Sequence, residues 1–303
     1  MKREFLQLCS NYKDQDLRSY YMSTKLDGQR CFWDGGISRG LTEVPFASVK
    51  GVATGLWSRY GKVIHAPDWF LDRLPAMPLD GELYIHGNRQ ECRSIVSRLI
   101  PDDRWNEISY KIFNSPPLKS IFADGYIDNL FYKQRFRGVV PWALDLTDRI
   151  PGFFTFGPVS YFNEVYDKLK TYDIWNSNLD LVDQVDADPG ALDSFLDQGF
   201  EGLVFQHKYS FYQCCRSKVT LKMKPDFDSE GVVVGFEDGK GKYLGMMGSV
   251  VLDWKGIVFN ISGFTDLERS WGYFKIGDMI TFKYRSLTNS GVPVEARFFR
   301  KYN

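Results

Sequence analysis

The pattern of helix and strand signals changes near residues 225–229, within the segment KPDFDSE. This change constrains the fold more than any other feature of the sequence. Before it, helical and strand patterns mix. After it, glycines separate the β-rich runs GVVVGF, GSVVLDW, IVFNISGF and GDMITFKYRSL. About five strands in roughly 75 residues predict a small OB-fold β-barrel, although a structural β-domain without a ligand has the same pattern. We therefore expect two domains, residues 1–225 and residues 226–303.

The first domain is expected to be of the α+β class. Its helical patterns lie at residues 126–137, 160–173 and 189–198, the last of which follows the helix start DADPG. Strand-like runs recur at residues 21–26, 79–85, 108–114 and 201–206. Residues 139–185 carry no motif of known chemistry.

Composition excludes several classes of protein. Lys plus Arg equals Asp plus Glu at 38 each, so a nucleic-acid surface has to be a local patch. Five cysteines without a CxxC pair, and three scattered histidines, argue against a disulfide framework and a zinc site. The N-terminus has no apolar signal region, and no run approaches ~18 apolar residues. A reduced, cytoplasmic location and no membrane contact are expected.

The sharpest motif is Lys25-Leu26-Asp27-Gly28-Gln29-Arg30. A lysine can act as a nucleophile when its amine is neutral, and nearby cations and desolvation favour that state. The Asp-Gly turn would place Lys25 at a strand end and let backbone approach a ligand. Arg30 supplies a planar fork for a phosphate or a terminal nucleotide. The alternative is a simple hairpin turn between polar strands.

Three companion motifs follow in order: DGEL with Glu82, EGLV with Glu201, and LKMK with Lys222 and Lys224. In a strand the two lysines of LKMK point to the same face, which favours an anion such as an α-phosphate between them. Each motif alone fits an edge turn or a solvated strand. Together they predict one nucleotidyl-transfer site, in which the carboxylates hold a ribose hydroxyl and Mg²⁺ or Mn²⁺. No GxxxxGK[ST] loop is present to hold a triphosphate.

With these motifs the chain resembles the covalent nucleotidyltransferase superfamily of ligases and capping enzymes, and most of all the small ATP-dependent DNA ligases of phages, viruses and bacteria. The resemblance runs from about Tyr20 to Lys301. It implies an ATP-grasp-like adenylation domain of antiparallel sheets, with Lys25, Lys222 and Lys224 as catalytic residues and Glu82 and Glu201 at the metal. The nucleotide-binding residues that it implies are Thr24, Lys25, Arg30, Arg59, Glu82, Phe113, Arg216, Lys222 and Lys224.

The sequence also departs from that pattern. The adenine-stacking aromatic is usually followed by Asp, but here Asn114 follows Phe113. The end of the chain, RFFRKYN, has no RxDK element to orient pyrophosphate. The residue that orients pyrophosphate is therefore not identified by its motif.

The resemblance implies sealing of 3′-hydroxyl/5′-phosphate nicks in duplex DNA by a monomer, through AMP carried on Lys25. ATP is expected rather than NAD, because the motif begins near the N-terminus and no nicotinamide-binding domain precedes it. RNA ligation, or capping with GTP, is the alternative within the superfamily. A non-catalytic nucleic-acid-binding protein is the alternative of another class. The sequence does not separate replication, repair and recombination, nor a bacterial cytoplasm from that of a phage or virus host.

Overall fold

A computed structural model describes residues 3–44, 47–122, 160–288 and 290–302. The chain divides into two compact units, Met1–Met223 and Lys224–Asn303, and each has its own apolar core. The helix expected at 126–137 lies outside the described residues. None of the helices that the structure describes is long and apolar enough to cross a membrane.

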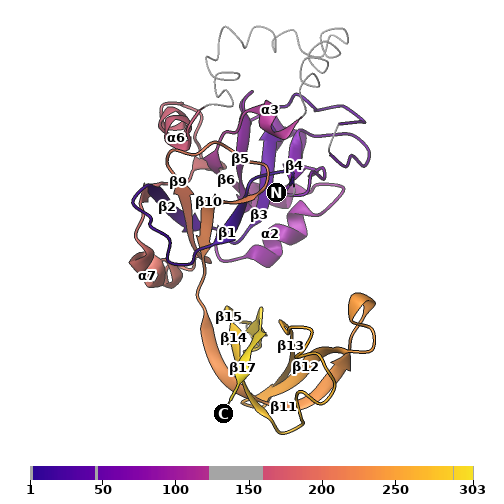
Figure 1. Cartoon of the computed structure of the whole chain (residues 1–303). Coiled ribbons are helices and arrows are strands. Elements are labelled where there is room, and N and C mark those ends of the chain that lie inside the picture. The colour runs from indigo at the N-terminus through magenta and orange to yellow at the C-terminus, as the bar shows by residue number, and fades with distance from the viewer. Residues whose placement is uncertain (1–2, 45–46, 123–159, 289, 303) are drawn as a thin grey trace. The chain divides into compact units, whose positions relative to one another are not determined.

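Two five-stranded sheets form the first unit (Figure 1). The first sheet has the order β1 (Leu8–Asn11), β10 (Arg216–Met223), β9 (Gly202–His207), β2 (Tyr20–Lys25), β8 (Val185–Asp186). The second has the order β4 (Leu56–Ser58), β3 (Gln29–Asp34), β5 (Pro78–Tyr84), β6 (Ser109–Asn114), β7 (Leu179–Leu181). The four strands expected from sequence correspond to β2, β5, β6 and β9.

The expectation of antiparallel sheets needs a correction, because two of the pairings are parallel. Strand β1 runs parallel to β10, and β6 runs parallel to β7. Parallel neighbours require a long connection between them. Both pairs meet this condition, since about 200 residues separate β1 from β10 and more than 60 separate β6 from β7. The unit therefore has mixed sheets, and the α+β class stands.

Short helices complete the first unit: α1 (Asp68–Leu71), α2 (Arg89–Val96), α3 (Leu118–Ile121), α6 (Phe162–Lys170), α7 (Leu192–Asp197), and the 3₁₀ turns η1 (Asp103–Glu107) and η2 (Pro189–Ala191). The helix expected at 160–173 is confirmed by α6, whose buried face repeats at helical spacing from Phe162 to Leu169. The helix expected at 189–198 is confirmed as η2 followed by α7.

Alternation along β6 decides which of its side chains face the core. Tyr110, Ile112 and Asn114 are buried, whereas Ser109, Lys111 and Phe113 are partly exposed. Successive side chains of a strand point to opposite faces, so Phe113 faces away from the core that buries Ile112. Strand β5 is buried almost throughout, as expected of a strand with neighbours on both sides.

The second unit is a five-stranded sheet of order β13 (Ile257–Ile261), β12 (Met247–Trp254), β11 (Phe227–Asp238), β14 (Met279–Tyr284), β17 (Arg297–Lys301). The 3₁₀ turn η3 (Gly241–Tyr243) and the pair β15 (Ser286–Leu287) and β16 (Pro293–Val294) complete it. The strand ladders among the described residues do not close the predicted OB-fold β-barrel. A single bridge from Ser262 to Arg297 joins the two edges, so the sheet curls without fully closing.

Gly81 permits the close pairing of β5 and β6. A Cβ on Gly81 would lie 2.3 Å from the Lys111 carbonyl oxygen, which is backbone and cannot move aside. We expect Gly81→Ala to lower the free energy of unfolding by roughly 3 kcal/mol, as overpacking does. Gly87→Ala is the control, because φ is +67° there but nothing lies within 4 Å, so only about 1 kcal/mol of backbone strain is expected. Urea unfolding of both variants measures the difference, and equal losses would contradict the assignment.

Candidate active site

A cavity lies where the two sheets of the first unit face each other. Five of the residues expected at the nucleotide line it, and they come from both sheets. These are Thr24, Lys25, Arg30, Glu82 and Phe113. Further lining residues are Gln7, Cys9, Ser23, Leu26, Asp80, Asn114, Phe162, Gln184, Val204, Gln206, Tyr212 and Thr220.

Lys25 is the last residue of β2, where it pairs with Gly202 of β9. The Glu201 N–H donates to the Lys25 carbonyl oxygen at 3.0 Å, which fixes the backbone of both residues. The Lys25 ammonium forms an ion pair with the Glu201 carboxylate, and the two side chains are only 21% and 18% exposed. The structure therefore joins two residues that lie 176 positions apart and that the motifs had assigned to one site.

The Glu82 carboxyl group has a pKa well above the usual range. Its pKa is raised to about 7, mainly because burial disfavours the charged form. Arg30, Lys25 and the Gly28 backbone partly oppose this shift, whereas the nearby Glu201 charge adds to it. Gly28 is needed at this place, because a Cβ there would lie 2.2 Å from the Leu83 carbonyl oxygen and 2.9 Å from Cγ of Glu82. The turn after Lys25 thus packs directly on the DGEL strand.

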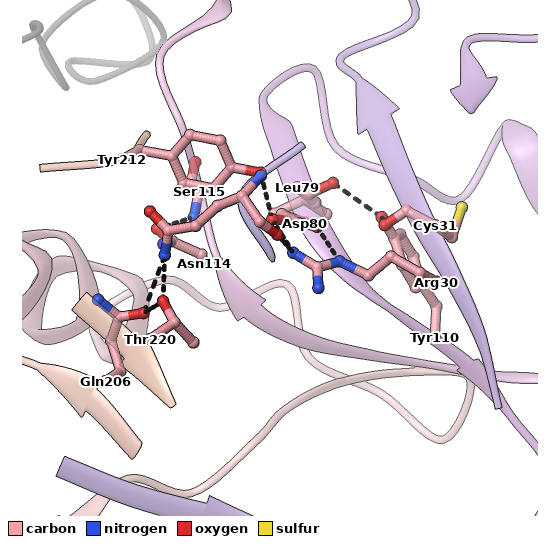
Figure 2. A network of polar contacts seen from close by, with 11 residues as sticks. Arg30, Cys31, Leu79, Asp80, Tyr110, Asn114, Ser115, Gln206, Tyr212 and Thr220 are labelled. Carbon is pink, nitrogen blue, oxygen red and sulfur yellow. Dashed lines mark hydrogen bonds and ion pairs between the residues drawn. The ribbon is translucent and has the colours of Figure 1, made fainter. Parts of the chain in front are cut away.

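Arg30 is held by a buried carboxylate. Its Nε and Nη2 donate to the two Asp80 oxygens, both at 2.7 Å, and Tyr212 Oη donates to Asp80 Oδ2 at 2.7 Å (Figure 2). Asp80 is 0% exposed. Burial opposes the charge of Arg30, but Asp80 outweighs it and raises the pKa of the guanidinium. The same guanidinium lies 4.5 Å from the ring centroid of Phe113.

A second set of buried polar side chains continues from this pair. Gln7 Nε2 donates to Gln206 Oε1 at 3.0 Å and to Thr220 Oγ1 at 2.5 Å, and Thr220 donates to Gln206 at 2.6 Å. The Gln7 N–H donates to Tyr212 Oη at 3.1 Å and Arg30 Nη2 donates to the Gln7 carbonyl oxygen at 3.4 Å, so this set meets the Asp80 pair at the Gln7 backbone. Figure 2 shows Gln206 and Thr220 on one side of the network, with Asp80 and Arg30 on the other. The network spans both sheets.

Lys222 lies on β10, where it pairs with Val204, and Val204 pairs with Ser23 of β2. Residues directly opposite each other in a sheet project to the same face, so Lys222 shares the face of two cavity-lining residues. The cations of the site also act together on Cys9. Burial raises the pKa of its thiol, while the charges of Arg30, Lys25, Lys222 and Arg216 lower it.

Three further expected residues, Lys224, Arg59 and Arg216, do not line the cavity. Strand β10 ends at Met223, so Lys224 does not extend it and belongs to the second unit, 3.7 Å from Glu295. Pro225, the next residue, has no backbone N–H to donate to a neighbouring strand, which explains why the strand ends here. Arg59 follows β4, with its guanidinium 5.2 Å from the Tyr60 ring. Arg216 begins β10 and donates to the Cys9 carbonyl oxygen.

The residues that sequence reasoning missed are the buried hydrogen-bonding partners. Asp80 lies inside the DGEL motif, but only Glu82 of that motif was assigned a role in the site. Gln7 and Tyr212 belong to no motif, and their separation of 205 positions leaves no local signal.

In the described part of the chain, no group of three or more His, Cys, Asp or Glu side chains is arranged to hold a metal. Glu82 and Glu201 are close enough for their charges to interact. Protein sites often bind Mg²⁺ through one or two carboxylates together with substrate phosphates, so this pair fits a shared ion and not a protein-only metal site.

The Asp80 pair generates a prediction about stability. Asp80→Asn leaves Arg30 buried without its counter-charge, and we expect a loss of about 3–5 kcal/mol in the free energy of unfolding. Asp72→Asn breaks an ion pair with Arg39 at the surface and should cost below about 1 kcal/mol. Chemical unfolding of the two variants beside the parent measures both values. Similar small losses of unfolding free energy in both variants would show that the buried pair stabilises the fold no more than the surface pair does.

Glu82 generates a prediction about pH. A carboxyl whose folded pKa is raised from 4.5 to about 7 stabilises the fold fully below pH 4.5, and that contribution is lost as the pH rises through 7. Glu82→Gln removes this dependence. We therefore expect the free energy of unfolding of the variant to rise relative to that of the parent between pH 5 and 8. At 1.36 kcal/mol per pKa unit, the rise is at most about 3 kcal/mol.

Urea unfolding across that pH range, in protein freed of nucleotide and metal, measures the gain. Glu107→Gln, at an exposed position, is the control and should show no such trend. A difference between the parent and Glu82→Gln that stays constant with pH would refute the buried-carboxyl explanation.

Comparison with known proteins agrees with this architecture. Residues 238–301 match the DNA ligase OB-like domain family. A DNA ligase of Haemophilus influenzae is 26% identical over 301 residues, which cover 98% of this chain and 91% of the relative. A structure from a structure-function analysis of Lig E DNA ligases is 27% identical with a TM-score of 0.70, and 98% of each chain is covered. A further structure, Pmar-Lig_Pre, is 18% identical with a TM-score of 0.63 and covers 99% of this chain and 68% of its own; it shows likeness of fold. Domain family, sequence and fold agree: over nearly its whole length the chain is similar to DNA ligases, and residues 238–301 match the OB-like domain of these enzymes.

Proposed function

We propose that the protein is an ATP-dependent DNA ligase that joins a 3′-hydroxyl to a 5′-phosphate at a nick in duplex DNA. The observation that carries the proposal is the position of Lys25. It ends a strand at a cavity, in contact with Glu201, and shares the site with Glu82 and Arg30. The Haemophilus relative, named a DNA ligase, supports the reaction class.

In the first step, Nζ of Lys25 forms a bond to the α-phosphorus of ATP, and the bond from that phosphorus to pyrophosphate breaks. The Lys25 ammonium has to lose a proton before this attack, and Glu201 is the carboxylate in contact to accept it. AMP then moves from Lys25 to the 5′-phosphate of the nick. Finally the 3′-hydroxyl oxygen bonds to that phosphate and AMP leaves.

The other site residues take supporting roles in this proposal. Lys222, with Lys224 and Arg216, supplies positive charge for the phosphates, because charge concentrates at phosphorus during transfer. Thr24 lines the cavity, Phe113 offers a ring to the base, and Arg59 a further cation. Glu82 and Glu201 would hold Mg²⁺ or Mn²⁺, which neutralises phosphate charge when bound.

We propose further that residues 1–225 act as the adenylation domain and residues 226–303 as the OB domain that contacts DNA. A monomer in the cytoplasm, with a duty in replication, repair or recombination, completes the proposal. Sedimentation of the pure protein tests its monomeric state.

Labelling the protein with α-labelled ATP and Mg²⁺, followed by a denaturing gel and a chase with nicked duplex, tests the mechanism. We expect a label that survives denaturation and moves into sealed DNA. Lys25→Ala should reduce labelling by roughly 10⁴-fold or more, since it removes the nucleophile. Lys50→Ala, at an exposed lysine, is the matched control and should label normally.

Other outcomes would assign the protein differently. A stable label from GTP alone would indicate capping chemistry, and sealing of RNA only would indicate an RNA ligase. No label from either nucleotide, in protein first stripped of bound AMP, would leave a nucleic-acid-binding protein.

A further inference from the structure

We propose that Gln184 reads the base of the bound nucleotide, and that its side-chain oxygen selects adenine over guanine. The inference rests on the proposed function, because it takes the cavity beside Lys25 as the nucleotide site. No sequence motif pointed to Gln184, and its case comes from strand register and hydrogen bonding.

The backbone brings Gln184 to the cavity between two strands. Val182 N–H donates to the Ile112 carbonyl oxygen at 2.7 Å, so the chain leaves β7 alongside β6, next to Phe113. It then reaches β8, where Val185 pairs with Met22 of β2. Continuing that antiparallel register by one residue puts Gln184 opposite Ser23. The Gln184 N–H donates to Tyr166 Oη at 3.0 Å, which fixes this crossing point.

A single row of residues therefore crosses the first sheet. Lys222 pairs with Val204, Val204 pairs with Ser23, and Ser23 lies opposite Gln184. Three strand spacings of about 4.8 Å separate the ends of this row, roughly 14 Å in total. That length suits a nucleoside monophosphate, with its phosphate toward Lys222 and its base toward Gln184. Val204 and Ser23 in the middle are small enough to leave room above them.

The apolar lining agrees with this orientation. Phe113 and Val204 come from opposite sheets and both line the cavity, so they can contact the two faces of a flat base. Phe162, at the start of α6, lines it as well. Base stacking on aromatic and apolar groups does not discriminate between purines. Discrimination requires a polar group at the base edge.

Gln184 differs from the other carboxamide side chains that line the cavity in the hydrogen bonding of its side-chain oxygen. Gln7 Oε1 accepts from the Gln213 N–H, Gln206 Oε1 accepts from Gln7 and Thr220, and Asn114 Oδ1 accepts from the Ser115 N–H. Gln184 Oε1 is buried and, among the described residues, has no hydrogen-bond partner. A buried acceptor without a partner costs free energy that a ligand donor recovers.

The base that offers such a donor is adenine. Its six-position carries an amino group, whereas guanine carries a carbonyl oxygen there. An amino group would satisfy Gln184 Oε1, but a carbonyl would place two acceptors against each other. The carboxylate that Gln184→Glu introduces can only accept, so this variant keeps the preference, while a methionine of similar length cannot accept strongly.

The test measures binding of ATP and GTP by calorimetry in a Lys25→Ala background, where no covalent adduct forms. We expect Gln184→Met to weaken ATP binding by roughly tenfold, the value of one hydrogen bond, and to reduce the ATP-over-GTP preference by a similar factor. Gln184→Glu should retain the preference. Gln198→Met is the matched control, since that carboxamide, one residue beyond α7, donates to the Ser194 carbonyl oxygen.

A second assay separates this inference from the proposed function. Sealing of a nick whose 5′-phosphate already carries AMP consumes no ATP, so the parent protein should seal it whatever the role of Gln184. The proposed function fails if the parent protein is never labelled by ATP, whatever the binding data show. The inference fails if Gln184→Met binds ATP and GTP as the parent does, if Gln184→Glu loses the preference, or if neither nucleotide binds.

Discussion

The buried ion pair of Arg30 and Asp80 is the interaction on which the rest of the site depends. Asp80 is fully buried and accepts two hydrogen bonds from Arg30 and one from Tyr212. Arg30 lies on β3 and Asp80 on β5, whereas Tyr212 comes from the segment between β9 and β10. The carboxylate therefore ties the two sheets together at the cavity. Removing Arg30 or Asp80 would leave the other charge without its partner, which favours the arrangement of the sheets that keeps the pair together.

This pair also fixes what the cavity can offer a ligand. Arg30 uses two donors on Asp80 and lies over Phe113, so its remaining donor capacity and the ring are held in one orientation. Gln7, Gln206 and Thr220 satisfy one another next to it. Fixed polar groups need little reorganisation when charge develops, and this favours transfer chemistry. Lys25 and Glu201 meet at the edge of this fixed frame, where a strand ends.

The sequence predicted the parts of this structure that have a local cause. The strand before Lys25 and the Asp-Gly turn after it follow from alternation and from the close approach that only Gly28 allows. Helix α6 follows from its apolar spacing. The pairing of β1 with β10 was not predictable in this way, because it joins residues some 200 positions apart. The partner of Arg30 was missed for a related reason, since a guanidinium suits a phosphate and a carboxylate equally well, and only the fold shows that Asp80 lies within reach.

The balance between acidic and cationic side chains in the site bears on how it would bind a nucleotide and a metal ion. The site contains two cationic side chains, Lys25 and Arg30, and three carboxyl groups, those of Asp80, Glu82 and the adjoining Glu201. Burial raises the pKa of Glu82 to about 7. Glu82 thus has no full counter-charge of its own, because Asp80 holds Arg30 and Glu201 holds Lys25. A divalent cation arriving with phosphates would supply that charge and favour the ionised form of Glu82. Glu201 is in contact with Lys25 and would accept its proton in the proposed first step. The two neighbouring carboxylates would then serve transfer in different ways, Glu82 as a ligand whose charge depends on its surroundings and Glu201 as the partner of the nucleophile.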